Sequence, residues 1–188
     1  MKYRPEIDGL RAISVVPVIL FHAGFELFSG GFVGVDVFFV ISGYLITTIL
    51  IENIKTNKFN IFDFYENRAR RIFPALYFLI LCITMVAIIL MNPEQLRDYG
   101  QSLLATVTFS SNIYFLIKAD YWAQSSEFLP LLHTWSLSIE EQFYLIFPVF
   151  LFMVMRLGHN RVLGMFVVLA TISFLFSEWE WHNNANSN

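Results

Sequence analysis

Two ionisable residues, Arg11 and His22, lie in an apolar stretch, Leu10–Phe25, that contains no other ionisable side chain. In a helix, eleven steps of about 100° return nearly to the starting direction, so the two side chains share one face. They would then lie about 16 Å apart along the helix axis, roughly half the thickness of a bilayer core. Because an arginine and an imidazole are costly to keep inside a membrane, the pair indicates a functional site.

A carboxylate, Asp36, is expected beside His22 if the first two apolar segments form an antiparallel hairpin. Both residues would lie roughly 4–5 Å below the turn. A carboxylate near an imidazole orients the ring and stabilises its protonated form, so His22 is a candidate general base with Asp36 as its orienting partner. The same pair would also serve as a hydrogen bond that only links two helices, and spacing alone leaves both interpretations open.

The arginines have two interpretations each. Arg11 is expected near the cytoplasmic end of its segment, where it would hold a phosphate or carboxylate through two hydrogen bonds. Alternatively, it is an anchor whose side chain extends to the membrane interface. Arg68, Arg70 and Arg71 precede a long apolar run. They would bind anionic lipid headgroups, or they would form a phosphate-binding cluster for a nucleotide-containing ligand.

Small residues at Ser42 and Gly43 interrupt the second apolar segment. They either allow close helix packing or open a cavity for a ligand. No histidine spacing resembles a zinc site, and no phosphate-binding glycine loop occurs, so no metal ligands are predicted.

The densest polar and aromatic stretch covers residues 133–144. Ser138 and Glu141 fit a capping box at the start of a helix, which would give Glu141 a structural role. Glu140 would share a helix face with Tyr144, four residues further on. With His133, Glu140 would form either an acid/base pair or a simple interfacial pair.

The composition is that of a helical membrane protein. Of 188 residues, 56% are hydrophobic and only 14% are charged, which is more apolar and less charged than soluble domains are. Strand-like alternation is weak, which disfavours a membrane β-barrel. No basic stripe with interleaved aromatic residues occurs, so no nucleic acid is expected as a partner. The single Cys82 excludes a disulfide framework within the chain.

The predicted fold class is therefore all-α, a polytopic transmembrane helix bundle of about five to six segments. The apolar runs that define the segments are Leu10–Phe25, Val33–Ile51, Ile72–Met91, Gln101–Ile117, Ser138–Met155 and Val162–Phe176. Between them we expect a polar, basic link at 52–71, a polar turn at 92–100 and a long connection at 118–137. A polar tail, 178–188, follows the last segment and is expected to fray.

The distribution of basic residues predicts the orientation. Lys2 and Arg4 precede the first segment, and five basic residues lie in the link after the second, whereas the turn between these segments has none. Because basic residues favour the cytoplasmic side, the N-terminus and the link are expected to be cytoplasmic.

Several motifs in the same order resemble the acyltransferase-3 family of membrane-bound O-acyltransferases. The resemblance includes the arginine, ten residues, histidine spacing of Arg11 and His22. It runs from residue 3 to about 150 and includes YRPEIDGLRAI (3–13), GGFVGVDVFFVISG (30–43), YENRARRIFPA (65–75), SNIYF (111–115) and LLHTWSLSIEEQFYLIFP (131–148).

This resemblance implies an enzyme that moves an acetyl group from acetyl-CoA to a hydroxyl group of a cell-surface polysaccharide. Lipopolysaccharide O-antigen, peptidoglycan and secreted glycans, lipid-linked or free, are the implied acceptors, and a bacterial inner (cytoplasmic) membrane is the implied location. By resemblance, His22 is catalytic with assistance from Arg11, and Arg68 and Arg71 face the cytoplasm and help to use the acyl donor. We add Asp36 as orienting residue, Glu140 on the acceptor side, and Ser42 with Gly43 along the donor passage.

The chain departs from the family in two respects. Asn67 stands where many relatives carry another arginine, and the family's membrane domain is much longer than 188 residues. Residues 1–177 are therefore expected to be the N-terminal part of such a domain. The chain would be a fragment, a truncated gene product, or one half of a split enzyme in which a second chain supplies further helices. The alternatives are an inactive remnant that needs a partner subunit and a transporter-like bundle.

Overall fold

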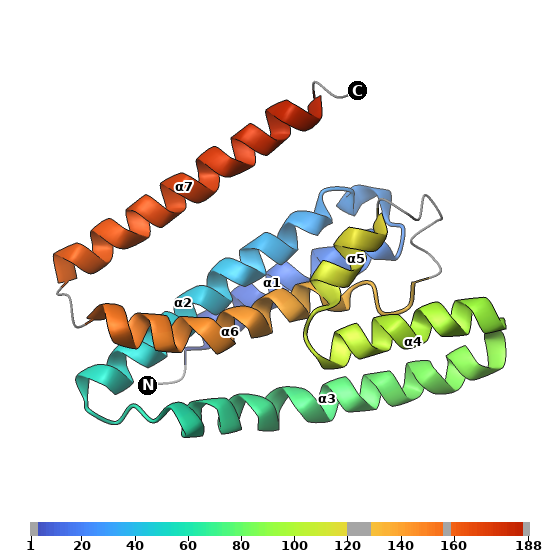
Figure 1. The fold of residues 1–188 in the computed structure, drawn as a ribbon, viewed down its shortest axis with the longest axis horizontal. Helices are drawn as coiled ribbons and strands as arrows, with labels where there is room; N and C mark the ends of the chain where they lie inside the picture. Colours follow the sequence, from blue (N-terminus) through green and yellow to red (C-terminus); the bar gives the residue numbers. More distant parts are fainter. Residues whose placement is uncertain (1–3, 120–128, 156–158, 186–188) are drawn as a thin grey trace. The chain divides into compact units, whose positions relative to one another are not determined.

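Every regular element in the described part of the chain, residues 4–119, 129–155 and 159–185, is a helix in the computed structural model (Figure 1). The predicted all-α fold is thus confirmed for these residues. The chain divides into two compact units, residues 1–146 and 147–188. The helices are α1 (Pro5–His22), α2 (Gly34–Lys55), α3 (Ile61–Leu90), α4 (Pro93–Val107), α5 (Ser111–Ala119), α6 (Thr134–Met155) and α7 (His159–Ala185), with short 3₁₀ turns η1 (Glu26–Phe28) and η2 (Gly31–Val33) between α1 and α2.

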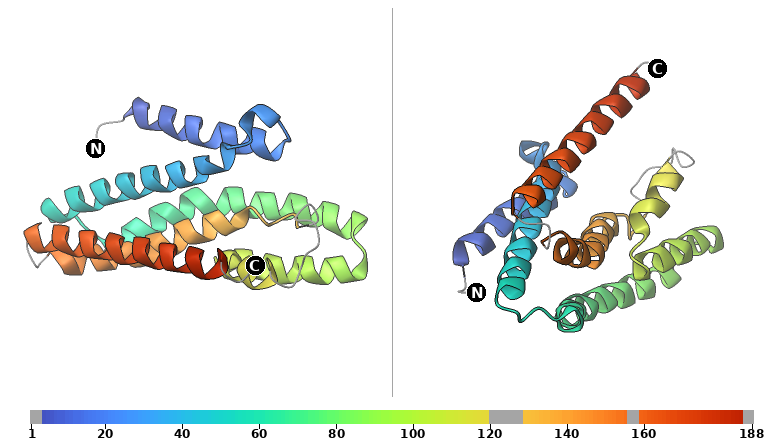
Figure 2. Two further views of the ribbon diagram at one scale, coloured as in Figure 1. Left: turned by 90° about the horizontal axis from the view of Figure 1, so that it is seen from above. Right: turned by 60° about the vertical axis from the view of Figure 1, so that its left-hand side comes forward.

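The first two helices form the predicted antiparallel hairpin (Figures 1 and 2). Two glycines allow the close approach of its arms. A Cβ atom on Gly31 would lie 2.2 Å from the Pro17 carbonyl oxygen, and one on Gly34 would lie 2.1 Å from the Ser14 carbonyl oxygen. No other residue type fits there, because real Cβ atoms do not come within 3.0 Å of backbone. Further along, Arg4 Nη1 donates to the Tyr44 hydroxyl at 2.8 Å.

The prediction of a polar link through residue 71 is wrong. Lys55 ends α2, Asn57 takes a left-handed conformation (φ 52°), and α3 begins at Ile61. The Asn60 side chain accepts a hydrogen bond from the Phe62 amide and caps the new helix. Arg68, Arg70 and Arg71 therefore lie on the first turns of a 30-residue helix rather than in a loop.

The predicted turn at 92–100 and single segment at 101–117 are also wrong. Helix α4 already begins at Pro93, behind a capping box in which Asn92 and Gln95 exchange hydrogen bonds of 2.9 and 3.1 Å. The chain then breaks at Phe109, whose φ of 51° is incompatible with a continuous helix. Two short helices, α4 and α5, replace the one expected span.

Helix α6 begins four residues before the predicted start, so Ser138 is not an N-cap and the predicted capping box with Glu141 is wrong. Ser138 lies inside the helix, and its Oγ lies 2.7 Å from Ser111 Oγ. Thr134 Oγ1 lies 3.0 Å from both Thr106 Oγ1 and Ser111 Oγ. These buried hydroxyl groups tie α6 to α4 and α5.

The second unit contains the end of α6 and the whole of α7. Phe147, Phe150 and Phe166 form its aromatic contacts, with ring centroids 6.0–6.4 Å apart. Helix α7 continues to Ala185, so the first eight residues of the predicted frayed tail are helical.

Four stretches in the described ranges are long and apolar enough to cross a membrane: Gly31–Lys55, Ile61–Leu90, Thr134–Met155 and Arg161–Asn183. Their outward side chains are strongly apolar; Ile89 on α3, for example, is 79% exposed. Such helices fit an integral membrane protein of several spans. The count of five to six spans and the cytoplasmic N-terminus stay predictions.

Candidate functional site

A cavity of about 480 Å³ lies where the end of α1, the start of α2 and the start of α6 meet. We call it the histidine cavity. Helix α1 supplies His22 in its last turn, and α2 supplies Asp36 in its first turn. The remaining lining residues are Val18, Ile19, Phe32, Val35, His133, Trp135 and Ser136.

The His22 ring is held in a defined orientation by its own helix. Its Nδ1 lies 2.8 Å from the Val18 carbonyl oxygen, an atom that only accepts hydrogen bonds, so Nδ1 carries the proton. In the neutral ring, Nε2 is then the basic nitrogen. Because His22 is the last residue of α1, the negative end of the helix dipole stabilises the imidazolium that forms when Nε2 takes up a proton.

A second histidine contacts the first. The rings of His22 and His133 meet edge to face, with centroids 4.4 Å apart. Burial, followed by the proximity of His22, holds the pKa of His133 below its usual value. Both effects favour the neutral form of His133.

The structure brings Asp36 and His22 to the same cavity, as the hairpin predicts. Within the described residues, however, the hydrogen bond that fixes the imidazole comes from Val18, and none joins Asp36 to it. The orienting role of Asp36 therefore stays a prediction.

Arg11 lies within the hairpin beside Phe38, with its guanidinium carbon 5.2 Å from the ring centroid. Phe38 is about 3 Å along α2 from Asp36 but about 22 Å from Asn53 near the other end of that helix. Arg11 thus lies alongside the first half of α2, and its role in holding a phosphate or carboxylate stays a prediction. Its side chain is half-buried.

A second cavity, of about 270 Å³, lies at the opposite end of α2. We call it the cationic cavity, because Lys58, Arg68 and Arg71 line it against one carboxylate, Asp63. Three amide side chains add hydrogen-bonding groups: Asn53, Asn60 and Asn67, the last being the departure from the family pattern. Three cations and several amides on one concave surface suit a phosphate-bearing ligand.

Arg70 points elsewhere. It forms an exposed ion pair with Glu66, with Nη2 and Oε1 2.6 Å apart. Arg68 stacks on the Tyr144 ring, with its guanidinium carbon 4.3 Å from the centroid. Of the three arginines, therefore, Arg68 and Arg71 line the cationic cavity and Arg70 does not.

Between the two cavities lie the remaining predicted site residues. Glu140 accepts a hydrogen bond from the Tyr144 hydroxyl, which confirms that they share a face. Glu140 does not lie among the residues that line the cavity of His133. Ser42 is buried, and its Oγ approaches the Tyr144 hydroxyl without a hydrogen bond of good geometry. A Cβ on Gly43 would meet nothing within 4 Å, so close packing in the hairpin depends on Gly31 and Gly34 instead.

Sequence reasoning missed the contact between His22 and His133, which are 111 residues apart in the chain. No local sequence pattern predicts this contact, because it depends on how α6 packs. Composition gave the one indication of a site here, since His133, Trp135 and Ser136 begin the stretch that is richest in polar and aromatic residues.

Comparisons with known proteins give matches over most of the chain. A family model described as "Acyltransferase domain" matches residues 4–188. O-acetyltransferase OatA of Staphylococcus aureus is 39% identical over 175 residues, 92% of this chain and 29% of that protein. Peptidoglycan O-acetyltransferase OatA of Listeria monocytogenes is 38% identical over 180 residues, 95% of this chain and 29% of that protein. The chain thus spans less than a third of the length of these relatives. No solved structure matches it.

Proposed function

This chain belongs to the acyltransferase domain family, and on that premise we propose that it moves an acetyl group from acetyl-CoA to a hydroxyl group of a cell-surface polysaccharide. The resemblance in the sequence and the names of the relatives, which are O-acetyltransferases, support this activity. The helices suited to a membrane support a multi-pass protein, and the activity implies the bacterial cytoplasmic membrane as its location.

The observation that carries the proposal is the orientation of His22. With Nδ1 held by the Val18 carbonyl, Nε2 is the nitrogen left for chemistry. As a general base, Nε2 takes the proton of the sugar hydroxyl while its oxygen attacks the thioester carbonyl. The C–S bond breaks, the acetyl group ends on the sugar oxygen, and the imidazolium returns the proton to the thiolate. Alternatively, Nε2 attacks the thioester carbonyl and the C–S bond breaks to release the thiolate. The sugar oxygen then attacks acetyl-His22, the N–C bond breaks, and the hydroxyl proton passes to the thiolate.

Neighbouring groups support either route. His133 contacts the His22 ring edge to face and so helps to fix its position in the cavity. Once a positive charge forms on His22, Asp36 in the same cavity and the end of α1 stabilise it.

The cationic cavity suits the phosphate groups of coenzyme A. Arg68 and Arg71 present guanidinium groups that pair with phosphate oxygens, and Lys58 adds a third positive charge. About 25 Å of α2 separates Asn53 in this cavity from Asp36 in the other, close to the thickness of a bilayer core. A donor held at one end would extend its acyl arm past Ser42 toward the acceptor at the other.

Peptidoglycan is the first acceptor to test, because one relative is named a peptidoglycan O-acetyltransferase. O-antigen, which the family resemblance also implied, has no support from the relatives. Any second chain that supplies further helices would be part of the active assembly.

The test is acetyl transfer by the protein in lipid nanodiscs. Acetyl-CoA carrying a radiolabelled acetyl group is supplied with peptidoglycan fragments or with O-antigen polysaccharide, and alkali-labile label on the glycan is counted. We expect label on peptidoglycan fragments. Label on neither glycan, with intact acetyl-CoA, would refute the proposed activity. A covalent acetyl-protein formed without acceptor would select the route through acetyl-His22.

A further inference from the structure

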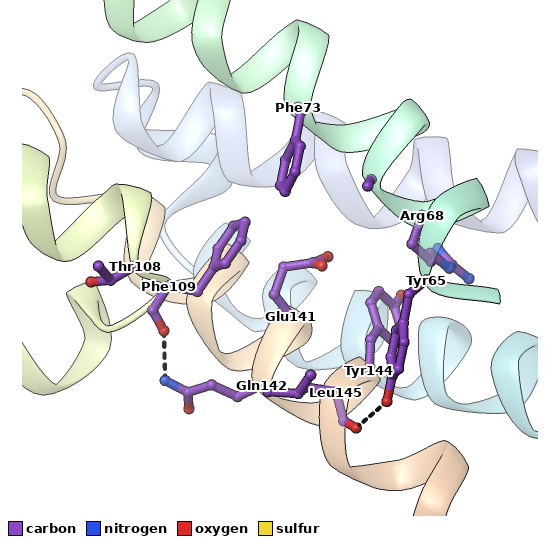
Figure 3. A pocket seen from close by; sticks show the side chains of 10 residues that line it. Tyr65, Arg68, Phe73, Thr108, Phe109, Glu141, Gln142, Tyr144 and Leu145 are labelled. Carbon is purple, nitrogen blue, oxygen red and sulfur yellow. Dashed lines mark hydrogen bonds between the residues drawn. The ribbon is translucent and has the colours of Figure 1, made fainter. Parts of the chain in front are cut away.

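A third cavity, of about 280 Å³, lies against the cationic cavity and shares Arg68 with it. Helix α3 contributes Tyr65, Arg68 and Phe73, the break between α4 and α5 contributes Phe109, and α6 contributes Glu141 and Tyr144 (Figure 3). Phe73 and Phe109 stack with their ring centroids 6.2 Å apart and their planes at 15°. We call this the aromatic cavity, and no role described above uses it.

Glu141 is the unusual group in this cavity. Its Oε1 is buried and has no hydrogen-bond partner in the described residues. A desolvated carboxyl oxygen without a partner is costly, and native proteins keep few of them. The side chain lies between the Phe73–Phe109 stack and Arg68, as Figure 3 shows. An unsatisfied buried acceptor that lines a cavity indicates a ligand with a hydrogen-bond donor.

The neighbouring polar groups already have partners, so they do not account for Glu141. Gln142 Nε2 donates to the Phe109 carbonyl at 2.7 Å and to Asn112 Oδ1 at 3.0 Å. The Tyr65 hydroxyl donates to the Leu145 carbonyl at 2.6 Å. The Tyr144 hydroxyl donates to Glu140. What the cavity still offers is therefore one acceptor, which lies beside the Arg68 guanidinium and between aromatic walls.

Charge narrows the class of ligand. The Arg68 guanidinium borders the cavity and offsets part of the negative charge of Glu141, which reduces the attraction of a cationic ligand. An anion would lose hydration against the aromatic walls and would lie beside the buried Glu141 carboxyl, so it is disfavoured as well. A neutral aliphatic chain with an amide N–H meets both conditions, because it buries apolar surface and donates to the carboxyl oxygen.

From these observations we infer that the aromatic cavity binds the neutral, amide-bearing arm of the acyl donor, with Glu141 accepting a hydrogen bond from an amide N–H of that arm. The inference rests on the proposed function, because it assigns the pantetheine arm of coenzyme A to this cavity and its phosphates to the cationic cavity. Arg68 borders both cavities and lies where the phosphates end and the arm begins.

The two halves of the coenzyme test this division separately. Inhibition constants against acetyl-CoA are measured for pantetheine and for adenosine 3′,5′-bisphosphate, with the protein in nanodiscs. We expect Glu141→Leu to weaken inhibition by pantetheine about tenfold, the loss of one hydrogen bond to a charged or strongly polar group. The same variant should change inhibition by the bisphosphate less than twofold. Arg71→Ala should show the opposite pattern.

Further variants keep the test informative if Glu141→Leu does not fold. Ala69→Leu fills the cavity without altering the carboxylate and should weaken inhibition by pantetheine to a similar extent. Glu94→Leu, on the exposed first turn of α4, is the matched control and should change neither constant. Pantetheine constants unchanged in both cavity variants, with acetyl transfer intact in the wild type, would overturn this inference alone. A wild type that transfers no acetyl group would overturn the proposed function, and this inference with it.

Discussion

The substitution Gly34→Ala tests how the first hairpin positions the histidine cavity. The new Cβ would lie 2.1 Å from the Ser14 carbonyl oxygen and 2.8 Å from Val18 Cγ2. Since real Cβ contacts are essentially never below 3.0 Å, α1 and α2 must separate by about 0.9 Å at this point. The main obstacle is backbone, so rotation of a side chain does not relieve it.

The magnitude follows from two opposing effects. Overpacking of this kind costs about 3 kcal/mol at the upper end of its usual range. The alanine restricts the unfolded chain and returns about 0.5–1 kcal/mol. The net loss is about 2 kcal/mol, which for a chain of this length lowers the unfolding temperature by about 4–8 °C.

The assay is thermal unfolding in detergent, followed by circular dichroism, with Gly100→Ala as control. Gly100 lies inside α4 with nothing within 4 Å of its Cβ position, so the control should be neutral or slightly stabilising. Gly31→Ala should resemble Gly34→Ala, and the double variant should lose less than the sum, because one separation of the helices relieves both clashes. An unfolding temperature in Gly34→Ala equal to that of Gly100→Ala would refute the close approach.

Three further predictions follow from the site and its support. Because the pKa of His133 is depressed in the folded protein, the unfolded chain binds more protons than the folded one as the pH falls below about 6.5. The unfolding temperature should therefore fall with acidification in that range, and it should fall less steeply in His133→Gln. A slope in His133→Gln equal to that of the wild type would contradict the burial of His133. Arg71→Ala should raise the KM for acetyl-CoA about tenfold. Arg70→Ala removes only an exposed ion pair and should change this KM less than twofold. Equal effects of the two variants would contradict the finding that Arg71 lines the cationic cavity and Arg70 does not. Thr134→Val should lower the free energy of unfolding by about 1–3 kcal/mol in urea titrations, because the buried hydroxyl groups of Thr106 and Ser111 lose a hydrogen-bond partner. The control Thr171→Val, at an exposed position, should lower it by less than about 0.5 kcal/mol. An unchanged free energy of unfolding in Thr134→Val would argue against the hydroxyl cluster.

The parts of the fold that the sequence predicted well are those with a strong local signal. Long apolar runs identified α2, α3, α6 and α7, because a membrane helix needs about twenty such residues in succession. The hairpin that brings His22 and Asp36 to one cavity followed from a short glycine-containing turn between two apolar runs.

The errors arose where polar residues continue a helix or a single residue breaks one. The charged residues before Ile72 looked like a loop, but Asn60 caps a helix that carries them on its first turns. The left-handed Phe109 divides an otherwise continuous apolar pattern, and nothing about a phenylalanine predicts that conformation. Ser138 fitted a cap by spacing, yet its hydroxyl serves packing against Ser111.

Within the site, residue types were predictable but their partners were not. His22 and Asp36 were chosen because ionisable residues inside apolar runs are expensive, whereas Arg68 and Arg71 were assigned to the acyl donor through the family resemblance. The Val18 carbonyl that fixes the imidazole and the His133 ring that contacts it depend on local geometry and on the packing of α6. Neither can be read from the spacing of residues.

The most direct test of the catalytic role of His22 is the single-turnover rate of acetyl transfer in His22→Asn. The asparagine amide can still donate to the Val18 carbonyl, so the end of α1 is preserved, but the basic nitrogen at Nε2 is gone. We predict a loss of at least about 10²-fold in rate with unchanged acetyl-CoA affinity. A rate equal to that of the wild type would contradict the assignment of His22 as the group that accepts the proton or the acetyl group.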